Sequence, residues 1–180
     1  CRDVEFTPKP RNRGHSGHKP HPLHVKKLEE IERCRLEAEE IVGALSERDL
    51  LIYGLALYLG EGAKTEDSGF GLANTSAAVM VSFAAWMRQF FEIDEGRLRV
   101  RLYLHEGLDI DAATQYWSTL LHIPPDQFTR PYRPQPRASG EFRKSKYQYG
   151  CATVRYSDVT VHRRVMAMID ALTSRFVIPG

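Results

Sequence analysis

The chain has few cysteines, no long apolar run and almost no net charge. Its 180 residues include three cysteines, Cys1, Cys34 and Cys151, which lie far apart and form no Cys-x-x-Cys pair. This usage argues against a disulfide-stapled domain and a zinc site, and is typical of a reducing cytoplasm. No apolar stretch approaches the ~20 residues that span a bilayer, so no membrane partner is expected. The charged, proline-broken start is not the pattern of a signal peptide.

The small net charge of +2 hides segments of opposite sign. Residues 1–28 contain seven Lys or Arg and two acids, and residues 127–155 contain seven Lys or Arg and one acid. Residues 29–49 are acidic, with eight Asp or Glu and three Arg. Two basic segments in a nearly neutral chain indicate a polyanionic partner. A Gly-rich phosphate loop after a strand is missing, which disfavours an enzyme acting on small phosphorylated substrates.

The sequence predicts three parts of different character. Residues 1–22 form a basic arm with too few apolar residues to fold alone. Arg11 and Arg13 lie there among glycines and prolines, as in arms that enter the DNA minor groove; a plain basic linker is the alternative. Residues 23–45 predict a connecting amphipathic helix, which is either a short coiled-coil arm or packed on the domain. Residues 46–180 hold the remaining elements and are expected to form the main domain.

The segment from Ser46 to Lys64, SERDLLIYGLALYLGEGAK, predicts a helix with a defined start and end. Ser46 and Asp49 have the spacing of a capping box, and apolar residues follow. The helix runs into Gly60-Glu61-Gly62. A carboxylate at this end opposes the helix dipole, so a nearby cation or polar ligand would offset the cost. The alternative is that Glu61 caps the helix or pairs with a basic side chain.

The rest of the domain alternates between helical and strand patterns. Strands are predicted at 70–74, 97–104, 128–133 and 149–156, and helices at 76–92, 109–121 and 158–173. The second of these helix patterns ends at Leu121, before two prolines, and begins at Asp109 or Asp111. The aromatic stripe of the 76–92 helix is most simply core. The fold class is therefore α+β.

The strand at 97–104 shows the clearest alternation in the chain. Its one face carries Arg97, Arg99, Arg101 and Tyr103, and its other face is apolar. Arginines on one solvated face repel each other, so a phosphate-lined ligand is the expected reason for them. We expect further basic residues at the same interface: Arg155 on the last strand, Arg130 and Arg133 near 128–133, and Arg143, Lys144 and Lys146 in the basic loop after them.

The element order, headed by GLALYLGEG, resembles a single-motif LAGLIDADG homing-endonuclease domain. The resemblance covers roughly residues 46–175 and points to bacterial relatives in which a helix-turn-helix precedes the domain. Gly60, Glu61 and Gly62 match the closing part of the motif, whereas Leu59 replaces its first acid and Ala56 a glycine. Arg2-Asp3-Val4 corresponds to the junction after the helix-turn-helix, so a DNA-reading segment is expected before Cys1.

The resemblance implies an αββαββα fold, with a saddle-shaped antiparallel sheet over double-stranded DNA and helices behind it. The helix at 111–121 is extra to this plan. Single-motif members are homodimers whose motif helices meet through small residues. Here the corresponding positions are Gly54, Ala56, Leu57 and Gly60.

The same resemblance leaves two functions open. In one, Glu61 from each subunit holds Mg²⁺ over the scissile phosphates and Lys64 balances charge, which makes the protein a site-specific endonuclease. In the other, the departures from the motif and the expected helix-turn-helix indicate a nucleoid-associated, cytoplasmic transcription regulator that binds DNA without cutting it, with no cofactor. The regulator is favoured and the nuclease is the alternative.

Overall fold

A computed structural model describes residues 21–63, 69–134 and 147–176. The predicted basic arm, residues 1–22, lies almost wholly outside these ranges. The chain divides into two compact units, Cys1–Ala44 and Leu45–Gly180. The first contains helix α1 (Pro22–Val42), none of whose residues is buried. Arg35, which interrupts the apolar seam of this helix, pairs within it with Glu32 and Glu39. The two alternatives for this helix stay predictions.

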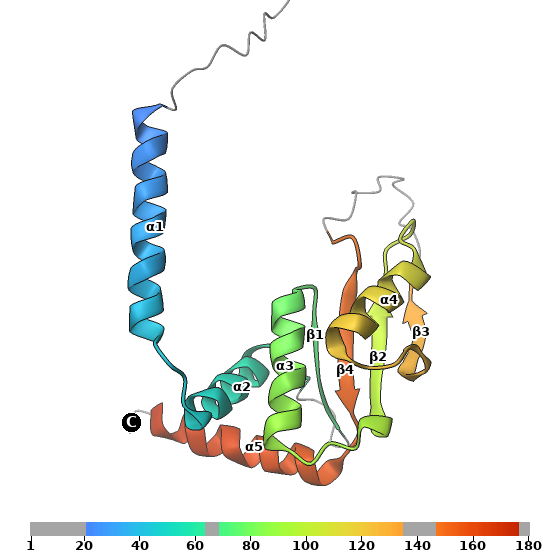
Figure 1. The fold of residues 1–180 in the computed structure, drawn as a ribbon. Helices are drawn as coiled ribbons and strands as arrows, with labels where there is room; N and C mark the ends of the chain where they lie inside the picture. The colour runs from blue at the N-terminus through green and yellow to red at the C-terminus, as the bar shows by residue number, and fades with distance from the viewer. Residues whose placement is uncertain (1–20, 64–68, 135–146, 177–180) are drawn as a thin grey trace, which may run out of the picture. The chain divides into compact units, whose positions relative to one another are not determined.

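The second unit alternates helices and strands around one sheet (Figure 1). The order is α2 (Glu47–Glu61), β1 (Phe70–Asn74), α3 (Ala77–Phe90), β2 (Leu98–Tyr103), α4 (Ile110–Leu121), β3 (Phe128–Tyr132), β4 (Cys151–Tyr156) and α5 (Val159–Thr173), with short 3-10 turns η1 (Glu95–Arg97), η2 (Pro125–Gln127) and η3 (Ser174–Phe176). These elements confirm the predicted α+β class. Within the described residues, no helix is long and apolar enough to cross a membrane.

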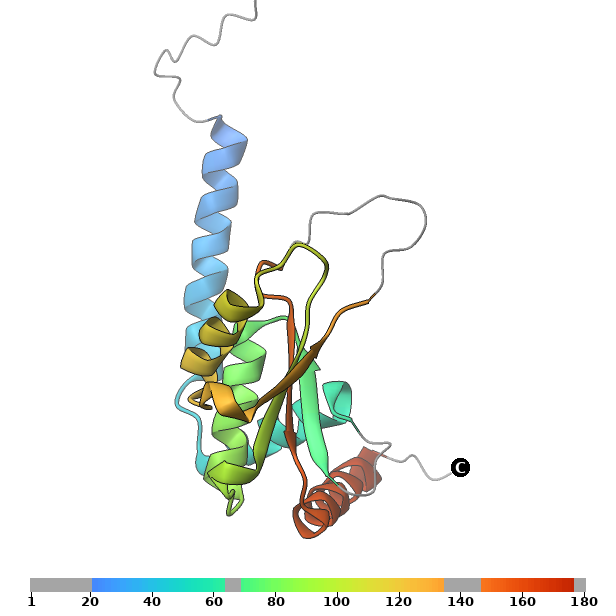
Figure 2. The ribbon, with the colours of Figure 1, turned by 90° about the vertical axis from the view of Figure 1, so that its right-hand side faces the viewer.

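The sheet is mixed, which differs from the antiparallel sheet that the resemblance implied. Its strand order is β1-β4-β2-β3. Strand β4 is antiparallel to both β1 and β2, but β2 and β3 are parallel. The extra helix explains this pair, because α4 carries the chain back before β3 begins, and parallel neighbours need such a crossover. Figure 2 shows α3 and α4 on the same side of the sheet.

Local capping places the helices where the sequence predicts them. Ser46 and Asp49 form the expected capping box, in which each side chain accepts from the other residue's backbone N–H. The side chains of Ser76, Asp109 and Asp158 cap α3, α4 and α5. Each of these contacts satisfies a backbone donor that the first helical turn would otherwise leave unpaired.

The core lies between the helices and the apolar face of the sheet, and an aromatic cluster is its centre. Phe70 on β1 is 1% exposed. Five rings surround it with centroids 5.8–6.5 Å away, namely those of Tyr58, Phe83, Trp86, Phe91 and Tyr156. Four of the five contacts lie close to perpendicular, the edge-to-face geometry that aromatic pairs prefer. The predicted aromatic stripe of α3 is thus confirmed as core.

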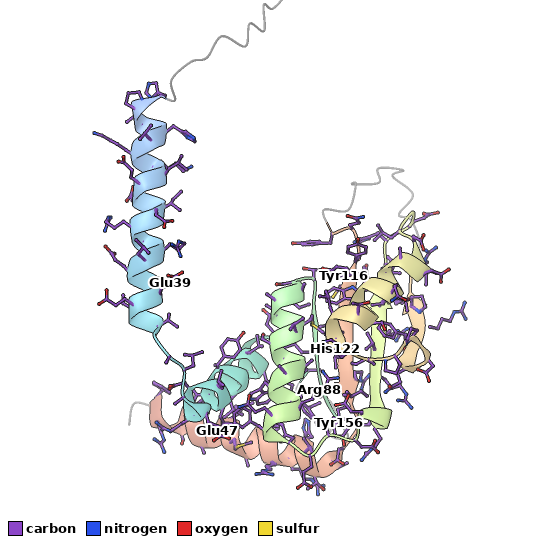
Figure 3. The ribbon with its side chains drawn as sticks, viewed as in Figure 1. Glu39, Glu47, Arg88, Tyr116, His122 and Tyr156 are labelled. Carbon is purple, nitrogen blue, oxygen red and sulfur yellow. The ribbon has the colours of Figure 1, made fainter. Side chains whose placement is uncertain are left out.

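An arginine clamp joins α3 to the segments around it (Figure 3). The Arg88 guanidinium donates to both carboxylate oxygens of Glu95, at 2.8 and 2.9 Å. It also donates to the Leu121 carbonyl at 2.9 Å, at the C-terminal end of α4. The hydrogen bonds from Arg88 hold the pKa of the Glu95 carboxyl below its usual value. The groove around Arg88, Glu95 and His122 is therefore structural, since its charged groups already satisfy each other.

Candidate nucleic-acid interface

Strand β2 presents its basic side chains to solvent, as its alternation predicts. Leu98, Val100 and Leu102 are buried, and the intervening Arg99, Arg101 and Tyr103 are exposed. The neighbouring strand β4 alternates in the same way, with Ala152, Val154 and Tyr156 buried and Arg155 exposed. Helices α3 and α4 lie on the apolar face (Figure 2), and the opposite face of the sheet, here named the open face, carries the polar residues.

The strand register brings Arg99 and Arg155 together. They are directly opposed in the antiparallel ladder of β2 and β4. On the far side of β4, Arg155 is paired with Gly71 of β1. A Cβ at residue 71 would lie 3.0 Å from the Arg155 Cγ and 2.5 Å from the Val154 carbonyl. Glycine at this position therefore leaves the space that the Arg155 side chain uses.

Nothing acidic on the strands offsets this pair of arginines. The described strand residues that share the open face are Gly71, Ala73, Arg99, Arg101, Tyr103, Thr129, Tyr132, Cys151, Thr153 and Arg155. Burial raises the pKa of the Cys151 thiol, so this group also stays neutral. Like charges directly opposite each other destabilise a strand pair. The Arg99 guanidinium also donates to the carbonyls of Gly96 and Leu98, and a bound anion would lower the repulsion between the two arginines further.

An aromatic row borders the arginines. Tyr103 on β2 is opposite Tyr132 on β3, and their ring centroids lie 5.3 Å apart. The Arg101 guanidinium carbon lies 5.9 Å from the Tyr132 ring centroid. His105, just after β2, contacts Tyr103 edge-on at 5.3 Å. Sequence reasoning named Tyr103 but missed Tyr132, because that residue reaches the open face only through the parallel pairing of β3 with β2.

The prediction that Arg97 belongs to this strand is wrong. Arg97 ends the 3-10 turn η1, and β2 begins one residue later. Its guanidinium donates to Asp158 Oδ2 at 2.9 Å and to the Ser157 carbonyl, and it lies over the Tyr156 ring. The Val161 backbone amide, helped by Arg97, holds the pKa of Asp158 below its usual value. Arg97 thus anchors the start of α5 instead of extending the open face.

Of the remaining predicted basic residues, the structure describes Arg130 and Arg133. Arg130 is exposed on the edge strand β3, and Arg133 donates to the Leu108 carbonyl at 2.7 Å. The latter contact ties the end of β3 to the segment before α4. The other basic candidates lie outside the described residues: Arg11, Arg13, Lys64, Arg143, Lys144 and Lys146.

Glu61 is exposed at the last position of α2, next to the C-cap residue Gly62. Gly62 forms an antiparallel bridge to Leu72, and the Tyr58 hydroxyl donates to the Ala63 carbonyl at 2.5 Å. These contacts fix the chain after the helix. Within residues 21–63, 69–134 and 147–176, however, no group of three or more His, Cys, Asp or Glu gathers in a way that could hold a metal ion. Among the described residues, a single chain therefore brings the carboxylate of Glu61 to this helix end without two further such ligands beside it.

The small residues of α2 fall on different sides of the helix. Gly54 is buried, and a Cβ there would lie 2.1 Å from the Trp86 indole, so its role is internal packing. This corrects the assignment of Gly54 to a dimer contact. Ala56 and Gly60 are exposed and Leu57 is half-buried. A Cβ on Gly60 would have no atom of the described residues within 4 Å.

Comparison of the chain with protein-family models, with curated proteins and with solved structures found no match.

Proposed function

We propose that this chain is a sequence-specific double-stranded DNA-binding protein that acts as a homodimer, in the manner of a nucleoid-associated transcription regulator. The observation that carries the proposal is the direct opposition of Arg99 and Arg155 on a sheet face whose described strand residues include no acid. Two arginines on neighbouring strands could each contact a phosphate group of a duplex. Arg101, one row further along β2, would add a third contact.

A LAGLIDADG-like origin of the domain is part of the same proposal. Helix α2 ends in Gly60-Glu61-Gly62, and the bridge from Gly62 to Leu72 turns the chain back along β1. The domain would then be a variant of that fold in which α4 is inserted before β3. This variant keeps the helices on one face and leaves the other face for the duplex.

Loss of Arg99 and Arg155 should weaken DNA binding and flatten its salt dependence. In the R99A/R155A double variant, the slope of log affinity against log salt should fall by about two, because each lost phosphate contact removes about 0.9 from it. Sites selected from random duplexes supply the probe, and fluorescence anisotropy over a salt series measures the affinity.

The matched control is R163A, which removes an exposed arginine of α5 and leaves the sheet unchanged. Its salt slope should equal that of the unaltered protein. Unchanged affinity and slope in R99A/R155A would remove the open face from the interface.

The exposed strip on α2 supports self-association through this helix. A glycine inside a helix costs about 1 kcal/mol relative to alanine, and no contact among the described residues requires one at residue 60. A second backbone approaching from outside would require it. Gly60→Arg should therefore convert a dimer to a monomer in sedimentation measurements, while the far-UV circular dichroism spectrum stays unchanged.

Ala171→Arg provides the control for this dimer test. It places the same charge on an exposed position of α5 and leaves the exposed strip of α2 unchanged, so the dimer should stay intact. A Gly60→Arg variant that still sediments as a dimer would show that the subunits meet elsewhere.

The endonuclease alternative rests on the exposed position of Glu61 at the end of this same strip. One chain supplies one carboxylate there, so a metal pair would need both subunits. This alternative predicts Mg²⁺-dependent cleavage of the selected duplex that disappears in Glu61→Gln, with binding retained. Intact duplex after incubation of the unaltered protein with Mg²⁺ excludes it for that site.

A further inference from the structure

The open face has two chemically different ends, and the second end is not explained by duplex phosphates. The row of Arg99 and Arg155 lies at one end, and the row of Tyr103 and Tyr132 lies at the other. We infer that the aromatic row stacks unpaired bases, so that the preferred ligand is a DNA duplex continued by a single-stranded segment. This inference rests on the proposed function and extends it to the class of DNA structure that the face accepts.

The spacing along β2 separates the two ends sufficiently for two kinds of contact. Arg99 and Tyr103 are four residues apart on one strand, which corresponds to roughly 13 Å at 3.3 Å per residue. A duplex bound by Arg99 and Arg155 could therefore end before the two tyrosines, and the strand that continues from it would then cross them. Bases inside a duplex have both faces covered by their neighbours in the stack, whereas unpaired bases can turn a face toward these rings.

The two tyrosine rings remain accessible in the folded domain. Tyr103 is 37% exposed and Tyr132 is 48% exposed. The rings lie 5.3 Å apart at an interplanar angle of 36°, with His105 next to Tyr103. Neither ring is part of the buried aromatic cluster around Phe70, so packing of the core does not account for them. Stacking of a base on such a ring contributes about 1–3 kcal/mol and tolerates any base.

Arg101 links the two ends of the face. It is exposed on β2 between Arg99 and Tyr103, and its guanidinium lies over the Tyr132 ring. An arginine at this position can contact the backbone phosphate of a nucleotide whose base stacks on the tyrosine. The charged side chains among the described strand residues of the open face are all arginines, namely Arg99, Arg101 and Arg155, which suits a nucleic-acid strand better than an apolar protein surface.

The test compares three labelled probes that share one 16-bp duplex. The first probe has blunt ends. The second carries a single-stranded tail of six unpaired thymidines, placed in separate versions at the 5′ or the 3′ end. The third has the same tail made of abasic sugar phosphates, which keep the charge and lack the bases. The measured quantity is the ratio of affinities for the tailed and the blunt probe. For the unaltered protein we expect a ratio of about ten or more with thymidines, and of close to one with the abasic tail.

Four variants attribute the gain to the rings. Y103L and Y132L keep apolar volume without a ring and should each reduce the ratio toward one. Y103F and Y132F keep the ring without the hydroxyl and should preserve it. R99A should weaken binding of all probes by the same factor and leave the ratio unchanged. Thermal unfolding of each variant verifies that the domain is folded.

Three results would overturn the inference: a ratio of one in the unaltered protein, an equal gain with the abasic tail, or a full gain retained in both leucine variants. If the blunt duplex binds with the expected dependence on Arg99 and the ratio is one, the inference fails and the proposed function stands. If none of the probes binds, both fail.

Discussion

Replacing Phe70 by alanine should destabilise the domain by about 4 kcal/mol, because buried Phe-to-Ala changes typically cost 3–5 kcal/mol. Phe70 is 1% exposed and contacts five other rings, so the cavity would open at the centre of the core. Its neighbours come from α2, α3 and β4 and from the residue after α3, and they cannot all move inward together. Urea unfolding followed by tryptophan fluorescence measures the change, which corresponds to a melting temperature about 8–16 °C lower.

Phe176 offers a matched control for the same substitution. It is 78% exposed in the short turn after α5, so Phe176→Ala removes the same atoms without opening a buried cavity. Its unfolding midpoint should stay within experimental error of the unaltered protein. Comparable destabilisation by both substitutions would mean that Phe70 is not at the centre of the core.

Gly54→Ala should destabilise the domain by about 3 kcal/mol even though alanine favours helices. The added Cβ would lie 2.1 Å from the Trp86 indole, far inside van der Waals contact. Trp86 is 3% exposed and rests against the aromatic cluster, so the indole has no free space to enter. Helices α2 and α3 must therefore separate, and the tryptophan emission should shift as the surroundings of Trp86 change.

Gly60→Ala in the same helix tests this explanation. Residue 60 has open space around it within the chain, so helix propensity alone should decide the effect, at up to about 1 kcal/mol of added stability. Urea unfolding at a protein concentration too low for self-association separates this effect from any dimer contact. Equal effects of Gly54→Ala and Gly60→Ala would contradict the packing against Trp86.

The two glycines of α2 lie on sides of the helix that have different surroundings. Its inner side approaches α3 through Gly54, and this contact holds the helices on the apolar face of the sheet. Its outer side, with Ala56 and Gly60, stays exposed. Because α3 and α4 lie on one face of the sheet, Arg99 and Arg101 of β2 remain exposed on the other.

Local chemistry made most of the elements predictable. The N-caps Ser46, Ser76, Asp109 and Asp158 all act as their positions predict, because a cap satisfies backbone donors a few residues away. Alternation in 98–103 and 151–156 correctly separated buried from exposed side chains, because successive residues of a strand point to opposite faces. These rules need no knowledge of distant segments.

Contacts between distant segments were not predictable in the same way. The parallel pairing of β3 with β2 depends on how α4 packs, and it alone brings Tyr132 beside Tyr103. The alternation placed Arg97 with Arg99 and Arg101, but in the structure Arg97 donates a hydrogen bond to Asp158, 61 residues later. The sequence pattern placed Gly54 in a dimer contact, whereas in the structure Trp86 of α3 packs against it.

Local sequence patterns therefore suffice to predict where helices and strands form and which side of β2 and β4 carries arginine, since these features depend on neighbours within a few residues. Which charged groups meet depends on how the whole chain folds. The tertiary structure opposed Arg99 to Arg155, paired Arg97 with Asp158 and placed two tyrosines at the end of the open face. The physical reason is that strand register and helix packing are set by the whole core, whose fit no short segment encodes.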